Sequence, residues 1–165
     1  EVPPHGTHNV TNVMLAIAVA QHEGLRPAAI ASKLRSFSPP AHTFDVREEK
    51  GVTLLDDTHN ASPASFAAAI AWARSQPAEH KVLLTNGLIE LGAEEYRIHT
   101  ELGTQAAPVF QRVIFLSPHR ANAFQEGYGR RTEFLGKRTQ RVESRSLLVC
   151  VGRMSSQTIR RMLPV

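Results

Sequence analysis

The chain has 165 residues, 42% of them hydrophobic, which is enough for one domain with a full core plus an appendage and hardly enough for two complete domains. Its single cysteine, Cys150, excludes an internal disulfide framework and a structural zinc site, and fits a cytoplasmic location. The early apolar run from Val13 to Ala20 is too short to span a bilayer, so neither a membrane anchor nor a signal peptide is expected. Because the sequence opens at Glu1 without an initiator methionine, we interpret it as part of a longer protein.

The charge balance does not favour a nucleic-acid partner. Lysine and arginine number 19 against 15 aspartate and glutamate residues, and the basic excess concentrates between residues 130 and 145. Only Phe134 lies among those basic residues, whereas nucleic-acid-binding surfaces interleave aromatic side chains on which bases stack. The basic stretch therefore favours a solvated face, with an anionic ligand as the alternative.

The first part of the chain reads as two helices and a connection. Thr7 is a candidate cap for a helix whose apolar run reaches Gly24, a natural C-terminal stop. Pro27 occupies a position that the first turn of a second, short helix tolerates. Residues 37–42 contain two prolines and predict a stiff, non-helical connection. We place a domain boundary there, so that residues 1–42 form a separate helical segment.

The second part, residues 43–165, alternates between strand and helix patterns. A hairpin is predicted first, because Lys50 and Gly51 separate two strand-like runs. The alternation predicts an α/β fold, a Rossmann-like and mostly parallel sheet with helices on both faces. The expected elements are strands over 44–48 and 52–56, a helix opened by Ser62 and Pro63, a strand over 81–85, a helix over 94–107, a strand over 112–116, a helix over 121–128, a strand over 146–151 and a helix over 156–163.

Ligands of open parallel sheets gather at the carboxyl ends of the strands, so the loops that follow the strands are the candidate site. Asp56, Asp57, Thr58, His59 and Asn60 form a dense polar cluster after the second strand run. A carboxylate at a strand end can accept hydrogen bonds from a ribose, and a following helix N-terminus favours anions. The alternative is that some of these residues only cap and brace the turn, but five consecutive polar residues exceed what capping requires.

Two further loops carry weaker signals. Asn86 and Gly87 follow the strand at 81–85, and Gly87 permits a left-handed backbone. Arg153 follows the last strand, where its paired donors suit a phosphate or carboxylate as well as an exposed surface position. His99, on the helix over 94–107, is interpreted as a packed or solvated residue.

Near the start of the chain, His8, Asn9 and Asn12 share one side of a helical turn, where amides can read the edge of a base or cap the helix. No GxxxxGK[ST] phosphate loop, GxGxxG fingerprint, HExxH or GxSxG motif occurs in the sequence. The chain therefore does not encode a complete apparatus for phosphoryl transfer.

Together these residues resemble the Mur ligase family. Gly6 and the following HNVTN run are similar to the GxHNxxNxxAA segment that ends the family's central ATPase domain. The block Leu55 to Ser65 (LDDTHNASPAS) is similar to the opening of the C-terminal domain, and its pattern is nearest to IDDxYNANPxSMxAAL of the MurF type, which adds D-alanyl-D-alanine. Further matches are Arg47, Gly51, the IELG run at 89–92, His99 and Gly103.

The sequence also departs from the MurF-type pattern. His59 replaces a tyrosine, Ser62 replaces an asparagine, and Thr85-Asn86-Gly87 stands where a GDM-like triplet is usual. The run at 151–153 lacks the lysine of a KGSR-like turn. These differences leave the incoming amine open between the MurF type and family members that amidate lipid-linked precursors, extend folate glutamates or build cyanophycin.

The resemblance implies an ATP-dependent amide ligase of peptidoglycan precursor synthesis that adds D-Ala-D-Ala to UDP-MurNAc-tripeptide through an acyl phosphate. It implies that the missing central domain holds the phosphate loop and Mg²⁺, so no residue of this chain is assigned as a metal ligand or as a proton-transfer catalyst. The implied nucleotide-binding residues are His8, Asn9, Asn12, Arg47 and Asp57, and the implied substrate-binding residues are His59, Asn60, Asn86 and Arg153.

On this interpretation the chain works with the remaining N-terminal and central domains of the same protein. Residues 1–42 are the trailing helices of the central ATPase domain, and residues 43–165 are the C-terminal domain. The chain alone is expected to be inactive. The alternative from another class is a stand-alone nucleotide-binding or interaction domain.

Overall fold

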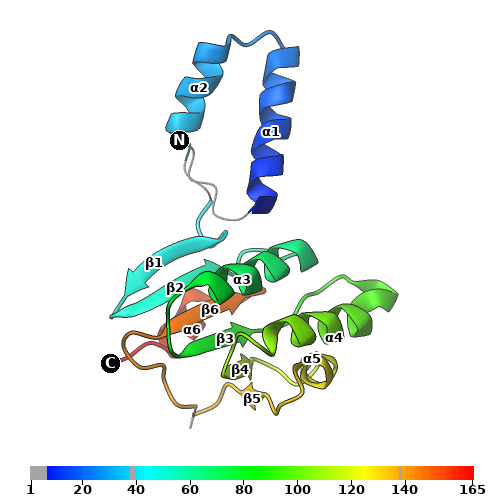
Figure 1. Cartoon of the computed structure of the whole chain (residues 1–165), viewed down its shortest axis with the longest axis vertical. Helices are drawn as coiled ribbons and strands as arrows, with labels where there is room; N and C mark the ends of the chain where they lie inside the picture. Colours follow the sequence, from blue (N-terminus) through cyan, green and yellow to red (C-terminus); the bar gives the residue numbers. More distant parts are fainter. Residues whose placement is uncertain (1–6, 38–39, 138) are drawn as a thin grey trace.

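The computed structural model describes residues 7–37, 40–137 and 139–165, and side chains from Val10 onward. Two helices, α1 (Thr7–His22) and α2 (Pro27–Arg35), lie side by side and project from an α/β unit (Figure 1). The predicted stop is confirmed, because Gly24 has a φ of +80° and the amide of Leu25 donates to the carbonyl of Ala20 at 2.9 Å. Glycine adopts this left-handed backbone without a steric penalty, so the chain can reverse direction there.

The α/β unit contains a six-stranded sheet in the order β1-β2-β6-β3-β4-β5. The first pair, β1 and β2, is antiparallel, as expected for the predicted hairpin, and every other pair is parallel. The elements are β1 (Asp45–Glu49), β2 (Val52–Asp57), α3 (Pro63–Ser75), β3 (Lys81–Thr85), the 3-10 helix η1 (Gly92–Glu94), α4 (Glu95–Ala106), β4 (Arg112–Phe115), α5 (Ala121–Tyr128), β5 (Glu133–Phe134), β6 (Leu147–Val151) and α6 (Ser156–Arg160).

Several element ends differ by one residue from the sequence prediction and the short η1 was not expected, but two differences are larger. The edge strand β5 was not expected, because two residues are too few to show an alternating pattern. The last helix ends at Arg160 and not at residue 163, since Pro164 disfavours helical backbone in the residue before it. Both differences lie away from the carboxyl ends of β2, β6 and β3.

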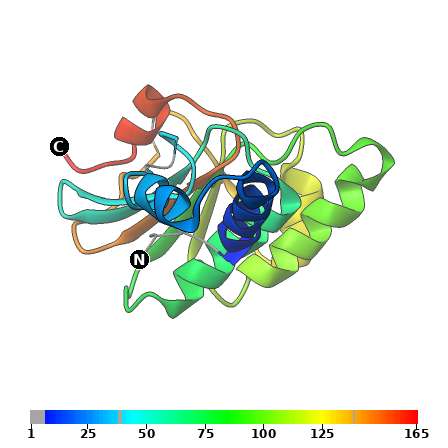
Figure 2. The ribbon, with the colours of Figure 1, turned by 90° about the horizontal axis from the view of Figure 1, so that it is seen from above.

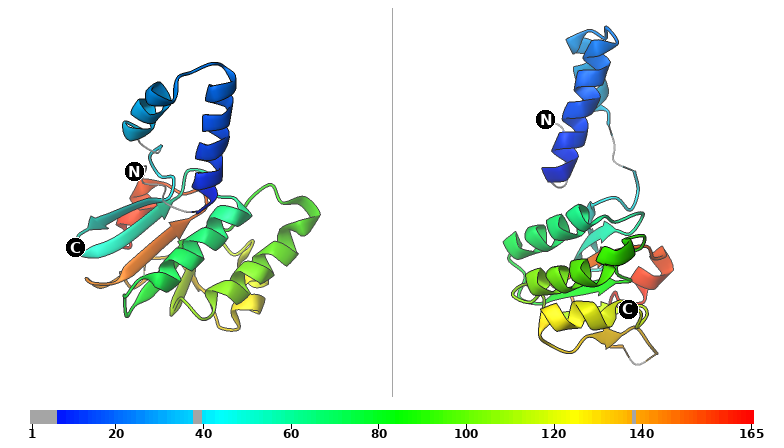
Figure 3. Two further views of the ribbon diagram at one scale, coloured as in Figure 1. Left: turned by 45° about the horizontal axis from the view of Figure 1, so that its top comes forward. Right: turned by 90° about the vertical axis from the view of Figure 1, so that its right-hand side faces the viewer.

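Helices cover both faces of the sheet, as predicted (Figure 3). On one face α3, α4 and α5 bury a cluster that includes Phe66, Leu83 and Phe124. On the other face α6 and the chain that follows it bury a smaller cluster that includes Leu84 and Ile159. Burial of these side chains, at roughly 25 cal/mol per Å² of apolar surface, is the main force that holds the layers together.

A close crossing joins α4 to α5. A Cβ atom at Gly103 would collide with the backbone carbonyl of Phe124, and one at Gly127 would collide with the backbone carbonyl of Thr100. Only glycine lets two helix backbones approach this closely. Gly103, which also matches the family motif, therefore has a packing role in this chain.

The helical pair leaves much of its apolar surface uncovered. Met14, Leu15 and Val19 on α1 are about 60% exposed, and Leu25 and Phe37 are also exposed. Seen from above, the pair stands over the α/β unit, and α1 contacts it at α3 (Figure 2). Residues 40–44 lead from the helical pair into β1. Among the described residues, no helix is long and apolar enough to cross a membrane.

Candidate functional site

The carboxyl ends of three neighbouring strands meet at one edge of the sheet. Asp57, Val151 and Thr85 lie in register at the ends of β2, β6 and β3. The chain leaves β2 toward α3 on one face, whereas it leaves β6 toward α6 on the other face (Figure 3). Open α/β sheets bind ligands outside the carboxyl ends of their strands, at a reversal of this kind, and we refer to this edge of the β2–β6 pair as the crevice.

Asp56 is the organising carboxylate of this edge. Its side chain is fully buried, and it accepts hydrogen bonds from Thr58 Oγ1 at 2.6 Å, from His42 Nδ1 at 2.8 Å and from Arg47 at 3.2 Å. A buried carboxylate is stable only when donors of this kind surround it. Asp56 therefore braces the loop, which is one of the two roles that its sequence position allows.

Asp57 follows at the end of β2 and is also buried. Its Oδ1 accepts a hydrogen bond from the backbone amide of Phe44 at 3.1 Å, and the Phe44 ring packs edge-on against Trp72. The next two residues of interest, His59 and Asn60, have exposed side chains. The loop thus presents a buried carboxylate with polar, accessible side chains directly beside it.

None of the five polar residues from Asp56 to Asn60 is needed to cap α3. Ser62 caps that helix, as predicted, by accepting from the amide of Ser65 at 3.1 Å, and Ser65 Oγ accepts from the Ser62 amide at 2.9 Å. Because the helix start is already satisfied, the side chains of His59 and Asn60 are available for a ligand.

Arg47 lies on β1 and points toward the same edge. Its guanidinium donates to Asp45 at 2.5 Å, to Asp56 at 3.2 Å and to Glu49 at 3.4 Å. Burial opposes the charge of this side chain, but the hydrogen bonds that it donates to Asp56 and Asp45 outweigh this effect and raise the pKa of Arg47. A phosphate would therefore have to compete with three carboxylates for this arginine.

The loops after β3 and β6 cross closely beside the crevice. Gly152 has a φ of +90°, and a Cβ atom on it would lie 2.5 Å from the carbonyl oxygen of Gly87. Thr85 Oγ1 joins the two loops, because it donates to the Val151 carbonyl at 2.8 Å and accepts from the Gly87 amide at 2.9 Å. The two glycines thus fix how these loops meet.

Two of the predicted residues lie on these loops. Asn86 is half-buried and accepts a hydrogen bond from Ser117 at 3.2 Å. Arg153 is exposed, and its guanidinium makes no hydrogen bond within the described part of the chain. The fold therefore brings Asp57, His59, Asn60, Asn86 and Arg153 to one edge of the sheet.

His99 on α4 supports the loop after β3 and is a packed residue, one of the two states expected from the sequence. It is fully buried, its Nδ1 donates to the Glu95 carbonyl at 2.7 Å, and its Nε2 accepts from the Leu88 amide at 3.0 Å. Burial lowers the pKa of His99, which keeps the ring neutral and able to accept that hydrogen bond. The imidazole thereby holds the loop after β3.

The residues near the start of the chain lie on α1. Asn12 has an exposed side chain. The end at which α1 begins faces the α/β unit (dark blue in Figure 1). The backbone of His8 and Asn9 belongs to the same helix, while their side chains and Gly6 lie outside what the structure describes.

Two residues at this edge were not predicted. His42 lies in the connection before β1, where a histidine after two prolines and an alanine gives no recognisable signal. Ser156 opens α6, and its Oγ lies 3.5 Å from His42 Nε2. Only the folded chain brings these two residues together.

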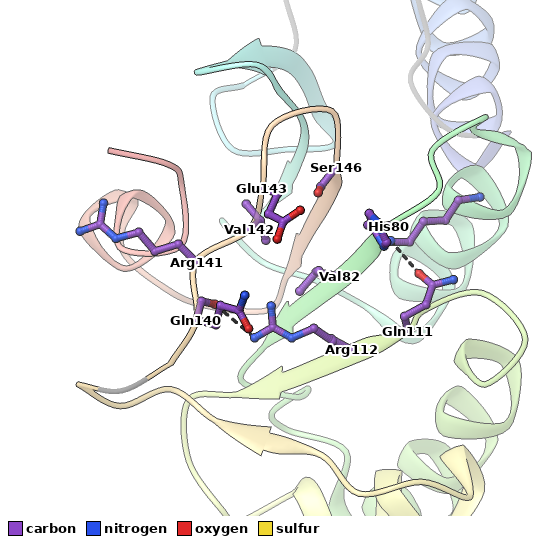
Figure 4. A pocket seen from close by; sticks show the side chains of 10 residues that line it. His80, Val82, Gln111, Arg112, Gln140, Arg141, Val142, Glu143 and Ser146 are labelled. Atoms are coloured by element: carbon purple, nitrogen blue, oxygen red, sulfur yellow. Dashed lines mark hydrogen bonds between the residues drawn. The ribbon is translucent and has the colours of Figure 1, made fainter.

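A small cavity of about 190 Å³ lies at the opposite edge, near the amino ends of β3, β4 and β6 (Figure 4). Arg112, which lines it, is already paired with Glu133 through two hydrogen bonds of 2.9 Å and also donates to the Gln140 carbonyl. The hydrogen bonds of Arg112 lower the pKa of Glu133. This cavity lies away from the strand ends that carry the predicted residues.

Taken together, the fold and its crevice define a Rossmann-like α/β domain of the kind that binds ligands at the carboxyl ends of its strands. No protein-family model matches the chain. Among curated proteins, the UDP-N-acetylmuramoyl-tripeptide–D-alanyl-D-alanine ligase of Bacillus subtilis is 33% identical over 109 residues, which are 65% of this chain and 24% of that ligase. The UDP-N-acetylmuramate–L-alanine ligase of Acaryochloris marina is 38% identical over 80 residues, which are 47% of this chain and 16% of that protein.

Solved structures share the fold. A crystal structure of MurF from Acinetobacter baumannii matches with a TM-score of 0.75 and 19% identity, covering 95% of this chain and 37% of that one. A MurF ligase from Thermotoga maritima in complex with ADP matches with a TM-score of 0.69 and 23% identity, covering 95% of this chain and 38% of that one. The resemblance to Mur ligases of the MurF type is thus confirmed, and the partial coverage fits a C-terminal domain. The chain spans about a quarter or less of the length of the curated relatives that it matches.

Proposed function

We propose that this chain is the C-terminal part of an ATP-dependent amide-bond ligase of peptidoglycan precursor synthesis, which adds D-alanyl-D-alanine to UDP-MurNAc-tripeptide. The observation that carries the proposal is the Asp57 carboxylate, buried at the end of β2 beside β6. This position suits a ribose, whose hydroxyls donate to a carboxylate. The likeness to a ligase solved with ADP supports a nucleotide as the ligand.

The proposal divides the chain at residue 42. Residues 43–165 form the C-terminal domain, and residues 1–42 belong to the end of a central ATPase domain. The exposed apolar side chains of α1, such as Met14 and Leu15, support this division, because a soluble domain seldom leaves several large apolar side chains on one helix uncovered. In the whole protein, the rest of the ATPase domain covers them.

In the proposed reaction, a substrate carboxylate attacks the γ-phosphorus of ATP and forms an acyl phosphate, with ADP as the leaving group. The amine of D-alanyl-D-alanine then attacks the acyl carbon, and phosphate leaves as the amide bond forms. Activation is needed because a carboxylate oxygen is a poor leaving group. Positioning and charge stabilisation supply most of the catalysis of phosphoryl transfer, and closure of a domain excludes water that would hydrolyse the acyl phosphate.

The residues at the crevice have assigned roles in this proposal. Asp57 binds the ribose, and His59, Asn60, Asn86 and Arg153 face the incoming dipeptide. Arg153 is the side chain best suited to its carboxylate, since its guanidinium is exposed and can donate two parallel hydrogen bonds.

The remaining assignments concern the nucleotide. His8, Asn9 and Asn12 on α1 lie near the adenine, and Arg47 meets the phosphates. Of these, Arg47 requires the largest rearrangement, because its three carboxylate partners have to be exchanged for phosphate oxygens. The described residues contain no group of three or more histidine, cysteine, aspartate or glutamate side chains that could hold a metal ion, so the proposal assigns Mg²⁺ to the central domain.

The proposal places the full-length protein in the cytoplasm, and the test uses that protein after purification. Purified enzyme is incubated with ATP, UDP-MurNAc-tripeptide and a panel of amines, and ADP release is measured. D-alanyl-D-alanine is expected to support release, and Asp57→Ala is expected to raise the KM for ATP, while the exposed-residue control Gln111→Ala leaves it unchanged. ADP release that no amine stimulates would overturn the ligase proposal.

A second candidate is a ligase of the same family with another amine. The observation that favours this candidate is the 38% identity over 80 residues to a ligase that uses L-alanine. Release of ADP with L-alanine and not with D-alanyl-D-alanine would select it. A free-standing nucleotide-binding domain is the remaining alternative, and it predicts that the gene encodes no GKT-containing segment ahead of residue 1.

A further inference from the structure

The chain between the helical pair and β1 has an unusual backbone. His42 and Phe44 have φ values of +62° and +48°, and neither is glycine. Left-handed backbone costs free energy in residues with a Cβ atom, so it persists where surrounding contacts hold it. Contacts with the strand ends therefore have to hold these two residues in place.

Four contacts anchor this segment to the strand ends. His42 donates from Nδ1 to Asp56 at 2.8 Å, and its backbone carbonyl accepts from the amide of His59 at 3.0 Å. The amide of Phe44 donates to Asp57 at 3.1 Å. On the far side of the crevice, His42 Nε2 lies 3.5 Å from Ser156 Oγ at the start of α6.

The contact with Asp56 dominates this set. Asp56 is fully buried, and hydrogen bonds to buried charged groups are stronger than those between neutral groups. The same Oδ2 atom also accepts from Arg47 at 3.2 Å, so the carboxylate links β1, β2 and the connection before them. Because the Asp56 carboxylate can only accept, this contact favours the neutral tautomer with the proton on Nδ1, in which Nε2 can accept from Ser156 Oγ.

We propose that His42 is a positioning residue, which fixes the chain entering β1 to the crevice between β2 and β6. The anchored segment begins at His42, so the chain from this residue onward is held to the strand ends. The proposal rests on this geometry alone and does not depend on the ligase function. If that function holds, His42 sets the place from which the loop of Asp57 meets the helices of the neighbouring domain.

The test measures amide hydrogen exchange of His59 and Phe44 by NMR in the 165-residue chain without ligand. His42→Gly removes the imidazole while relieving the left-handed strain, and exchange at both amides is expected to accelerate about tenfold or more, the factor for one lost hydrogen bond to a charged group. His42→Asn is the conservative variant, because its amide places a donor near the position of Nδ1 and asparagine tolerates left-handed backbone. It is expected to restore protection to within about threefold of wild type.

Lys50→Gly is the matched control. Lys50 also has a left-handed φ of +53°, but its side chain is exposed in the turn between β1 and β2, so this variant relieves strain without removing a buried contact. Unchanged exchange at His59 and Phe44 is expected for it. Equal exchange in His42→Gly and wild type, or equally fast exchange in His42→Gly and His42→Asn, would overturn the proposal.

A measurement on the wild-type chain decides the matter if His42→Gly does not fold. Long-range ¹H–¹⁵N spectra distinguish the two tautomers of a neutral imidazole. At a pH where His42 is neutral, the proposal expects the proton on Nδ1. A proton on Nε2 would leave Asp56 without this donor and would refute the positioning role.

Discussion

Gly152→Ala tests whether the two loops beside the crevice meet as closely as the structure has them. The new methyl group would lie 2.5 Å from the carbonyl oxygen of Gly87, whereas carbon–oxygen contacts are normally about 3.3 Å or longer. Relief requires the loops to separate by roughly 1 Å, and overpacking of this kind costs about 1–3 kcal/mol. The left-handed φ of +90° adds about 1 kcal/mol for a residue with a Cβ atom.

The expected loss of unfolding free energy is therefore about 2–4 kcal/mol. Gly129→Ala is the matched control, because Gly129 has a φ of +67° and no atom lies within 4 Å of the place that its new methyl group would take, so it costs about 1 kcal/mol. Urea unfolding followed by the fluorescence of Trp72 measures both variants. With a slope of about 2 kcal/mol per M, Gly152→Ala lowers the midpoint by about 1–2 M, and equal midpoints for the two variants would refute the close contact.

Three more predictions concern packing and titration. Gly103→Ala is expected to lower the unfolding free energy by about 1–3 kcal/mol, because a methyl group there strikes the backbone of α5, whereas Gly136→Ala, with only one atom at 3.9 Å, is expected to be nearly neutral; equal effects would contradict the close crossing. Burial lowers the pKa of His99, so the unfolded state binds a proton that the folded state excludes, and stability falls as the pH drops below about 6.5. His99→Gln is expected to lose this part of the pH slope and exposed His80→Gln to keep it, and an unchanged slope in His99→Gln would be the contrary result. Burial also raises the pKa of Cys150 well above its usual value, so a disulfide reagent is expected to label the chain only as fast as it unfolds, and rapid labelling of the native chain would contradict its burial.

Local patterns were sufficient for most of the helices and strands and for the loop that carries the paired carboxylates. Strand runs that alternate with helices predicted an α/β fold because parallel strands need crossover helices. Ser62 and Gly24 were readable as helix signals since capping and left-handed backbone depend on neighbouring residues only. The polar run at 56–60 was recognisable because it follows a buried strand directly.

Arrangement in space was not readable in the same way. The position of β6 between β2 and β3 creates the crevice, and it depends on which strands pair across about 90 residues of sequence. The pairing of Arg47 with Asp45 and Asp56 follows from the antiparallel register of β1 and β2, so a motif alone presented this arginine as available. The edge strand β5 exists because β4 offers it a partner, not because of its own two residues.

His42 makes the same distinction at the level of one residue. By sequence it is a histidine in a proline-rich connection, with nothing that links it to a carboxylate 14 positions later. Long-range contacts outweigh its local backbone preference, because a hydrogen bond to the buried Asp56 offsets the cost of a left-handed φ. The sequence by itself determined the strands and helices other than β5 and η1, and the chemistry of the Asp56–Asp57 loop. Only the tertiary structure decided which side chains of distant segments face that loop, since contacts between them form only when the sheet assembles.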